Sequence, residues 1–127
     1  MIKKLKYCIV AVVFSMGVLV PLTAYAAVNN VSYDFKHMVA VNGKMNATKG
    51  TLSGSVSVSN WGKDSSFSVK LFEHRVILND IYKGGTYFSP TGNKKFSYSV
   101  TKGKSYCAEF WKNQNGKYIS GKASFSY

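Results

Sequence analysis

The residues of this chain that could do acid–base or metal chemistry are few and widely spaced. After the first 26 residues there are two histidines, one cysteine and five Asp or Glu residues. Glu73 and His74 are adjacent, and on a strand their side chains would point to opposite faces, so they could not easily share one metal ion. Asp34 and His37 meet the same objection.

No spacing in the sequence predicts a catalytic or metal site. Zinc needs three or four His, Cys or carboxylate ligands, and no cluster supplies them. Zinc-protease, serine-hydrolase, phosphate-loop and CxxC motifs are absent from the sequence. A glycosidase needs two carboxylates across a cleft, and nothing selects Asp80 and Glu109 as that pair. We therefore predict a protein that is not an enzyme and has no cofactor and no metal site.

The start of the chain predicts a cleaved secretion signal. Three lysines among the first six residues precede an apolar run, and Ala24-Tyr25-Ala26 matches a small-x-small cleavage pattern. The apolar run is shorter than the roughly 20 residues of a membrane-spanning helix. We predict a signal peptide at residues 1–26, a single secreted domain at residues 27–127, and an extracellular or cell-surface location.

The mature domain would hold a single cysteine, Cys107, because Cys8 leaves with the signal peptide. A domain of roughly 100 residues can bury one core, and with one cysteine it has no internal disulfide. Its stability must then come from apolar strands. We interpret Cys107 as a part-buried inert thiol, with a disulfide between two chains as the alternative. We expect a monomer.

The sequence is strongly basic. It has seventeen Lys and Arg residues against five Asp and Glu. Three of the lysines lie in the leader, so the mature chain has a net charge of about +9. The basic residues are scattered singly, with only Lys94 and Lys95 adjacent, which is not the pattern of a nucleic-acid arm. In a secreted protein the anionic partners would be cell-wall polymers, acidic polysaccharides or a membrane surface; solubility and protection of strand edges are the alternative.

Alternating apolar and polar residues predict strands through the mature chain. Strands are expected at residues 31–41, 51–60, 67–71, 96–100, 104–111 and 118–127, with residues 76–78 as a further short strand or a crossover. Residues 42–50 and 79–92 are predicted to be loops. About seven strands favour an all-β antiparallel sandwich. Tyr106 begins the penultimate strand, where immunoglobulin-like sandwiches often place a tyrosine corner, so we predict an immunoglobulin-like version.

The last two strands are predicted to pair as a hairpin. Asn115-Gly116 between two alternating runs is the strongest short hairpin signal. A two-residue turn there would pair Tyr106 with Phe125. It would also place Glu109 opposite Lys122 as a favourable charge pair.

The outward side of that hairpin is the predicted binding surface. Trp111 and Tyr118 would be diagonal neighbours among lysines, and flat rings beside cations suit sugar rings, headgroups or peptides. The alternative is that Trp111 packs under residues 79–92 as a second small core. The candidate ligand-binding residues are Trp111, Tyr118, Lys112, Lys117, Lys122, Tyr82, Tyr87 and Phe88.

One stretch of the chain is similar to a known family. The tail Lys122-Ala123-Ser124-Phe125-Ser126-Tyr127, with Trp111 upstream, resembles the end of the lactococcin-type β-sandwich bacteriocins. The resemblance implies a secreted cationic protein that acts on cell-wall synthesis at the division septum. It covers only the tail, and this chain lacks the family's Gly/His/Tyr-rich N-terminal half.

These observations lead to one predicted function and two alternatives. We predict a secreted, non-enzymatic, cationic β-sandwich that binds an anionic cell-envelope component, either a wall polymer or a membrane surface, and no nucleic acid. The first alternative is a bacteriocin-like antibacterial protein. The second is an inhibitor of an extracellular hydrolase, which would bind its protein partner through residues 79–92.

Overall fold

The computed structural model describes residues 26–127, so the predicted signal peptide lies outside the described residues except for Ala26. The regular structure of this range consists of eight strands. They are β2 (Ala27–Phe35), β3 (Met38–Asn46), β4 (Thr51–Asn60), β5 (Phe67–His74), β6 (Ile81–Phe88), β7 (Lys95–Ser99), β8 (Ser105–Trp111) and β9 (Ile119–Ser126). Within residues 26–127 there is no helix with the length and hydropathy to cross a membrane.

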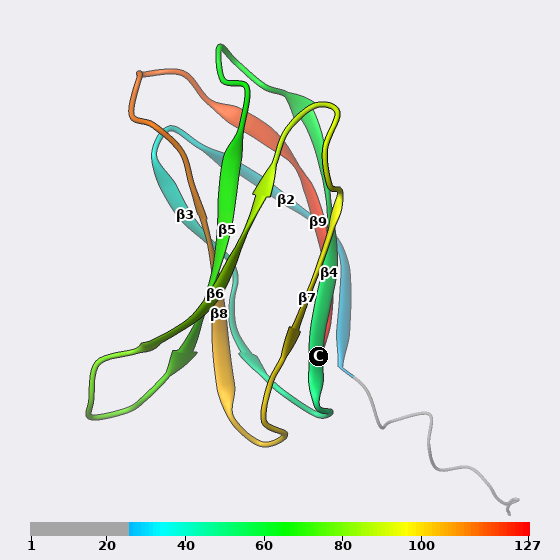
Figure 1. Cartoon of the computed structure of the whole chain (residues 1–127), viewed down its shortest axis with the longest axis vertical. Coiled ribbons are helices and arrows are strands. Elements are labelled where there is room, and N and C mark those ends of the chain that lie inside the picture. Colours follow the sequence, from blue (N-terminus) through cyan, green and yellow to red (C-terminus); the bar gives the residue numbers. More distant parts are fainter. Residues whose placement is uncertain (1–25) are drawn as a thin grey trace, which may run out of the picture.

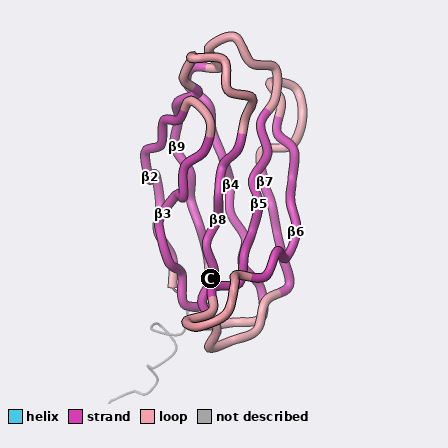
Figure 2. Tube along the Cα trace, turned by 90° about the vertical axis from the view of Figure 1, so that its left-hand side faces the viewer, coloured by secondary structure: helices cyan, strands magenta, loops and turns pink. Residues whose placement is uncertain are grey.

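The strands form two antiparallel four-stranded sheets that face each other across one core (Figure 1). One sheet has the order β2-β9-β4-β7 and the other the order β3-β8-β5-β6. The strands run along the long axis, with loops gathered at both ends (Figure 2). The prediction of an all-β antiparallel sandwich is confirmed.

The strand pairs are nested around one turn at residues 75–80. Strand β5 pairs with β6, β4 with β7, β3 with β8 and β2 with β9, so the chain doubles back along its whole length. Two further pairings, β4 with β9 and β5 with β8, fold this long ribbon into two sheets. Eight strands wound in this way have the arrangement of a jelly roll. The predicted immunoglobulin-like order, in which the first two strands are neighbours in one sheet, differs from both sheets.

The predicted C-terminal hairpin is wrong. Strands β8 and β9 lie in different sheets, and Asn115-Gly116 belongs to the connection that crosses between them. Tyr106 and Phe125 both face the core, but from opposite sides. Alternation reports which side of a strand is buried and not which strand lies beside it, so the same pattern fits either arrangement. Glu109 and Lys122 consequently face away from the molecule on opposite sheets.

Three predicted boundaries also change. Residues 31–41 form parts of two strands that turn at Lys36 and His37. Strand β3 continues to Asn46 through a bulge, where Asn42 and Gly43 have φ angles of 65° and 61°. Most of the predicted loop at residues 79–92 is strand β6, and residues 76–78 are its preceding turn.

An aromatic cluster fills one end of the core. The Phe67 ring stacks on those of Phe88 and Phe110 at centroid distances of 5.5 and 5.6 Å, and meets Phe35 edge-on at 5.6 Å. These rings come from both sheets, so their contacts hold the two layers together.

At the other end of the core, Tyr106 is hydrogen-bonded to the turn that precedes its own strand. Its ring is fully buried, and its hydroxyl accepts a hydrogen bond of 2.9 Å from the backbone N–H of Thr101. This is the contact of a tyrosine to backbone a few residues upstream that the sequence predicted, although the surrounding strand order is different.

We predict that Phe110→Ala costs about 3–5 kcal/mol of unfolding free energy, the usual penalty for truncating a buried aromatic ring. Ser57 is exposed on the outer side of β4, and Ser57→Ala should change stability by no more than about 0.5 kcal/mol. Chemical denaturation of both variants measures this difference. Equal effects would contradict the assignment of inward and outward faces.

Candidate functional site: an aromatic and basic sheet face

The outer faces of the two sheets differ in chemistry. On the β2-β9-β4-β7 sheet, serines sit opposite one another across the strands, as Ser53 does with Ser97 and Ser126. The outer face of the β3-β8-β5-β6 sheet instead carries aromatic and basic side chains. We call this second surface the aromatic face, defined by Trp111, Lys70, Phe72, Tyr82 and Tyr87.

A bulge in β6 places two tyrosines on the aromatic face. Tyr87 lies opposite Ser68, and Tyr82 lies opposite Phe72, with a register shift between them at Lys83. Without the shift, residues five apart on a strand would point to opposite sides. Alternation in the sequence therefore could not show that both rings share one face.

Three contacts fix the orientation of the Trp111 indole. Its Nε1–H donates to Glu109 Oε1 at 2.9 Å, and Lys70 Nζ lies 4.7 Å from the centre of its ring. The His37 ring meets its edge at 5.3 Å. Residues 79–92 do not cover Trp111 as a second core, because β6 is a strand of the same sheet. The indole is instead partly exposed beside a held cation.

Trp111 forms one wall of a hollow of about 390 Å³ on the aromatic face. The Tyr87 ring, which is 76% exposed, and Lys70 and His37 also line it. Ser66, Ser68 and Asn113 add polar groups to the rim. Aromatic surface beside an ammonium and several hydrogen-bonding groups suits a sugar ring or a similar group that carries negative charge.

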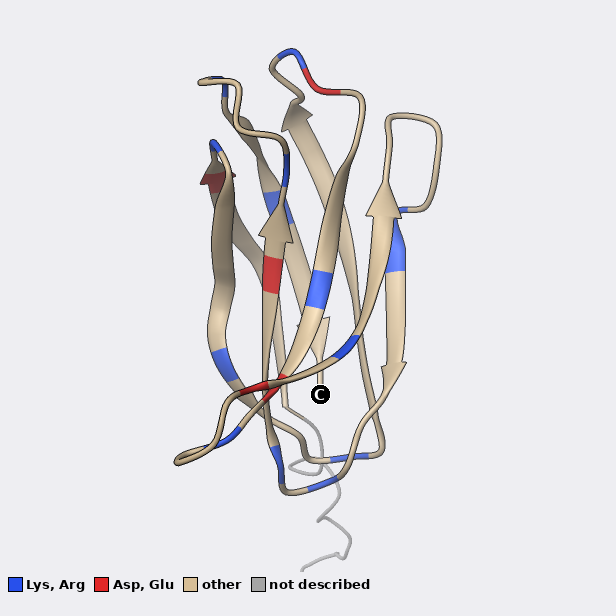
Figure 3. Ribbon diagram, turned by 60° about the vertical axis from the view of Figure 1, so that its left-hand side comes forward, with Lys and Arg blue, Asp and Glu red and all other residues tan. Residues whose placement is uncertain are grey.

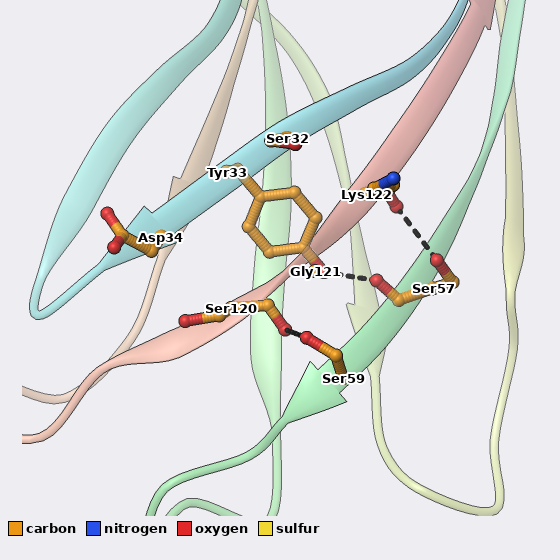
Figure 4. Close-up of a pocket in the computed structure, with 8 residues that line it drawn as sticks. All are labelled: Ser32, Tyr33, Asp34, Ser57, Ser59, Ser120, Gly121 and Lys122. Carbon is orange, nitrogen blue, oxygen red and sulfur yellow. Dashed lines mark hydrogen bonds between the residues drawn. The ribbon is translucent and has the colours of Figure 1, made fainter.

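A larger hollow of about 580 Å³ lies on the opposite sheet (Figure 4). Two of its four serine hydroxyls bond to backbone: Ser57 Oγ donates to Lys122 O at 3.3 Å and Ser59 Oγ to Ser120 O at 3.1 Å. The Tyr33 hydroxyl donates to Ser57 O at 2.9 Å. Burial raises the pKa of Tyr33 well above its ordinary value. This surface offers neither an exposed ring nor an ionisable phenol, so it is the weaker candidate.

Gly121 explains how the Tyr33 hydroxyl reaches that hollow. A Cβ at position 121 would overlap the Ser57 carbonyl oxygen and the Tyr33 hydroxyl. The absence of a side chain thus lets the tyrosine reach past β9 to Ser57 on β4. The hydrogen bond that results joins β2 to β4 across β9.

The prediction that Lys112 binds a ligand is wrong, because its ammonium is buried and has a structural role. Its side chain has no exposed surface. Its Nζ donates to the backbone oxygens of Lys36, Asn113 and Lys117 and to Asn115 Oδ1, all within 3.0 Å. Asp64 Oδ2 makes no well-angled hydrogen bond, and is held by the charge of Lys112 at 3.1 Å. The ammonium therefore ties together the connection between β8 and β9 and two neighbouring turns.

Of the other predicted ligand residues, only some lie near Trp111. Tyr87 shares its hollow and Tyr82 lies further along the same face, its ring 5.5 Å from that of Phe72.

Phe88 is buried in the core and is not available to a ligand. Lys122 lies on the opposite sheet. Lys117 is exposed on the connection between the sheets, and the Tyr118 ring faces Lys36 Nζ at 5.5 Å.

The sequence did not identify Lys70 or His37 as residues of the hollow, nor the polar residues of its rim. Lys70 alternates with buried Val69 and Leu71, so its outward direction was readable from the sequence. Its position beside Trp111 depends on the pairing of β5 with β8, which no local signal reveals. His37 lies in the turn between β2 and β3, which exposes it.

The remaining ionisable groups do not form a metal centre. Within residues 26–127, no three His, Cys, Asp or Glu side chains gather closely enough to hold a metal ion. Cys107 is a free, partly buried thiol in the same range. Burial raises its pKa, and the charges of Asp80 and Glu109 raise it further, so the thiol stays protonated near neutral pH.

In comparisons with known proteins, no family model and no curated protein matches this chain. The tail that resembles the lactococcin-type bacteriocins consists of the second half of strand β9 and Tyr127, and β9 is the neighbour of both β2 and β4. Its inward residues Ala123 and Phe125 belong to the core. The alternation of the tail thus follows from its place in the sheet.

We predict that Lys112→Met lowers the unfolding free energy by about 3–5 kcal/mol, because it leaves the buried Asp64 carboxylate without its cation. Adding Asp64→Asn should recover part of this loss, since the amide carries no charge. Lys117→Met is the matched control, because that side chain is exposed, and it should cost no more than about 0.5 kcal/mol. Thermal and denaturant unfolding provide the comparison; a mild effect of Lys112→Met would remove its structural role.

Proposed function

We propose that this protein is a secreted, non-enzymatic binding protein that attaches to an anionic polymer of a cell envelope through the aromatic face. The observation that carries the proposal is the hollow in which the Lys70 ammonium lies over the Trp111 ring, with the Tyr87 ring also lining it. A ring supplies contact area to a sugar, and the ammonium pairs with a phosphate or carboxylate on the same polymer.

The shape of the aromatic face supports an extended ligand. The face continues from the hollow toward Phe72 and Tyr82, in the direction of β5 and β6. Between the two tyrosines Gly85 has no side chain, and the Tyr82 hydroxyl lies over this position. The Tyr82 side chain thus extends along the face toward Tyr87, and an extended aromatic surface suits a chain of repeating units, whereas an enclosed cavity would take one small molecule.

The overall charge supports an anionic partner. Over residues 26–127 there are fourteen Lys and Arg residues and five acids. Basic residues are distributed over the strands and over the loops at both ends (Figure 3). Such a surface raises the local concentration of a polyanion and speeds its association.

The positions of the acids support a function in binding over one in catalysis. Glu73 is buried and paired with Lys104 and Lys83 at 3.4 and 4.0 Å. Glu109 accepts the Trp111 N–H, and Asp64 faces the Lys112 ammonium. These carboxylates neutralise or orient neighbouring groups and do not converge on a common cleft.

The test is binding of the purified protein to a phosphate-linked wall polymer, with an uncharged glucan as the comparison. Affinity for the anionic polymer should fall steeply between 50 and 500 mM salt, as the Debye length shortens from about 14 Å to about 4 Å. At fixed salt, Trp111→Ala should weaken binding about tenfold, because ring contact is not screened.

Tyr118→Ala is the matched control, since it removes an exposed ring at the same end of the molecule but outside the hollow. It should leave affinity within about twofold. Salt-sensitive binding without a Trp111 effect would reduce the site to a diffuse basic surface. Failure to bind the anionic polymer at low salt would overturn the proposal.

A further inference from the structure

The turn between β5 and β6 presents three consecutive aliphatic side chains to solvent. Val76 and Ile77 are each 92% exposed and Leu78 is 62% exposed. We call these three residues the apolar tip. Single exposed apolar residues are ordinary, but an exposed run of three at the end of a protruding hairpin indicates a contact surface.

The apolar tip is held outward by polar contacts at its base. Arg75 Nε donates to the Asn79 carbonyl at 2.7 Å, which closes the loop across the tip. Asp80 Oδ1 accepts the Arg75 backbone N–H at 3.3 Å and lies 3.3 Å from His74 Nδ1. These bonds fix the backbone on both sides of residues 76–78, so the aliphatic side chains point away from the sandwich core.

Basic residues surround this end of the sandwich. Arg75 begins the turn and Lys83 follows it, while Lys102 and Lys104 lie on the turn between β7 and β8 at the same end (Figures 1 and 3). Glu73 is buried between Lys83 and Lys104 and neutralises part of their charge. Lys102 is exposed, and its own turn contains no acid.

We propose that the apolar tip inserts into the interfacial layer of an anionic lipid bilayer, with Arg75, Lys83, Lys102 and Lys104 contacting the headgroups. Aliphatic side chains gain free energy on leaving water, and basic residues gain it near an anionic surface. Stable but reversible membrane binding generally needs two such signals together. This inference rests on the proposed envelope location but not on the Trp111 hollow, which lies at the opposite end of the sheet.

The form of the apolar tip favours a bilayer over a protein partner. Three side chains on a narrow turn supply far less than the roughly 800 Å² per partner of a stable protein–protein interface. The tip is also convex, so a protein would need a matching groove. A bilayer needs no such complementarity, and its negative surface matches the basic residues around the turn.

The experiment measures partition of the purified protein onto phosphatidylglycerol vesicles and onto phosphatidylcholine vesicles. The wild type should bind the anionic vesicles. The triple variant Val76→Ser, Ile77→Ser, Leu78→Ser should bind them at least tenfold more weakly, because the side chains that enter the acyl boundary are gone. Its melting temperature should stay unchanged, since the replaced side chains make no core contacts.

The basic residues are tested by Lys102→Gln. This change should weaken partition about fivefold, the factor that one basic residue contributes near an anionic membrane. Lys95→Gln is the matched control, because Lys95 is exposed on β7, outside this end's turns. It should have a smaller effect than Lys102→Gln.

A direct readout of insertion uses an environment-sensitive fluorophore on Ile77→Cys in a Cys107→Ser background. Its emission should shift to the blue on anionic vesicles, and the same probe on Ser97→Cys, exposed on the outer face of the other sheet, should not shift. A blue shift at both positions or at neither would overturn insertion of the tip.

The outcomes separate this inference from the proposed function. If the triple variant partitions like the wild type, vesicle binding is a matter of charge alone and the inference fails. If the wild type binds the anionic polymer but not the vesicles, the inference fails while the proposed function stands, and the apolar tip becomes a contact for a protein. Loss of polymer binding in the triple variant would show that one surface serves both ligands, which also contradicts the inference.

Discussion

The pairings of β4 with β9 and of β5 with β8 are the constraint on which the rest of the molecule depends. Without them the chain would be one long ribbon folded at residues 75–80, with an exposed apolar side along its whole length. The two pairings bend the ribbon into facing sheets and bring Phe67 against Phe110 of β8 and Phe35 of the opposite sheet. The same pairing of β5 with β8 places Lys70 beside Trp111. One strand pairing therefore determines both the packing of the core and the arrangement of the aromatic face.

The crossing from β8 to β9 needs its own stabilisation, because the chain leaves one sheet and enters the other without a hairpin. Lys112 supplies it. Its ammonium satisfies carbonyl oxygens of the crossing segment that would otherwise face the interior unpaired, and Asp64 balances the charge. A lysine used in this way cannot also meet a ligand. A charge count from the sequence includes Lys112 in the surface charge, whereas the structure places its ammonium in the interior.

The two proposed contacts lie at opposite ends of the β3-β8-β5-β6 sheet. The hollow is bounded by the start of β5 and the end of β8, and the apolar tip follows the end of β5. A protein that used both would bind the polymer along the outer face of this sheet and contact the bilayer with the apolar tip. The serine-covered outer face of the other sheet would then face the aqueous surroundings, in keeping with hydroxyls that bond mainly to their own backbone.

The sequence by itself determined the all-β class, the limits of β4 and β8, and the inward direction of Tyr106, Phe110 and Phe125, because alternation and burial are local properties of a strand. It also identified Trp111 and Tyr87 as candidates from their type. Only the tertiary structure decided which strands are neighbours, because the same alternating pattern packs equally well in a hairpin or across a sandwich. That decision separated Trp111 from Lys122, buried Lys112 and Phe88, brought Lys70 to the indole, and left residues 76–78 exposed at the end of a hairpin. For Lys70 and Trp111 the deciding interaction is the pairing of two strands far apart in the chain, where local pattern carries no information.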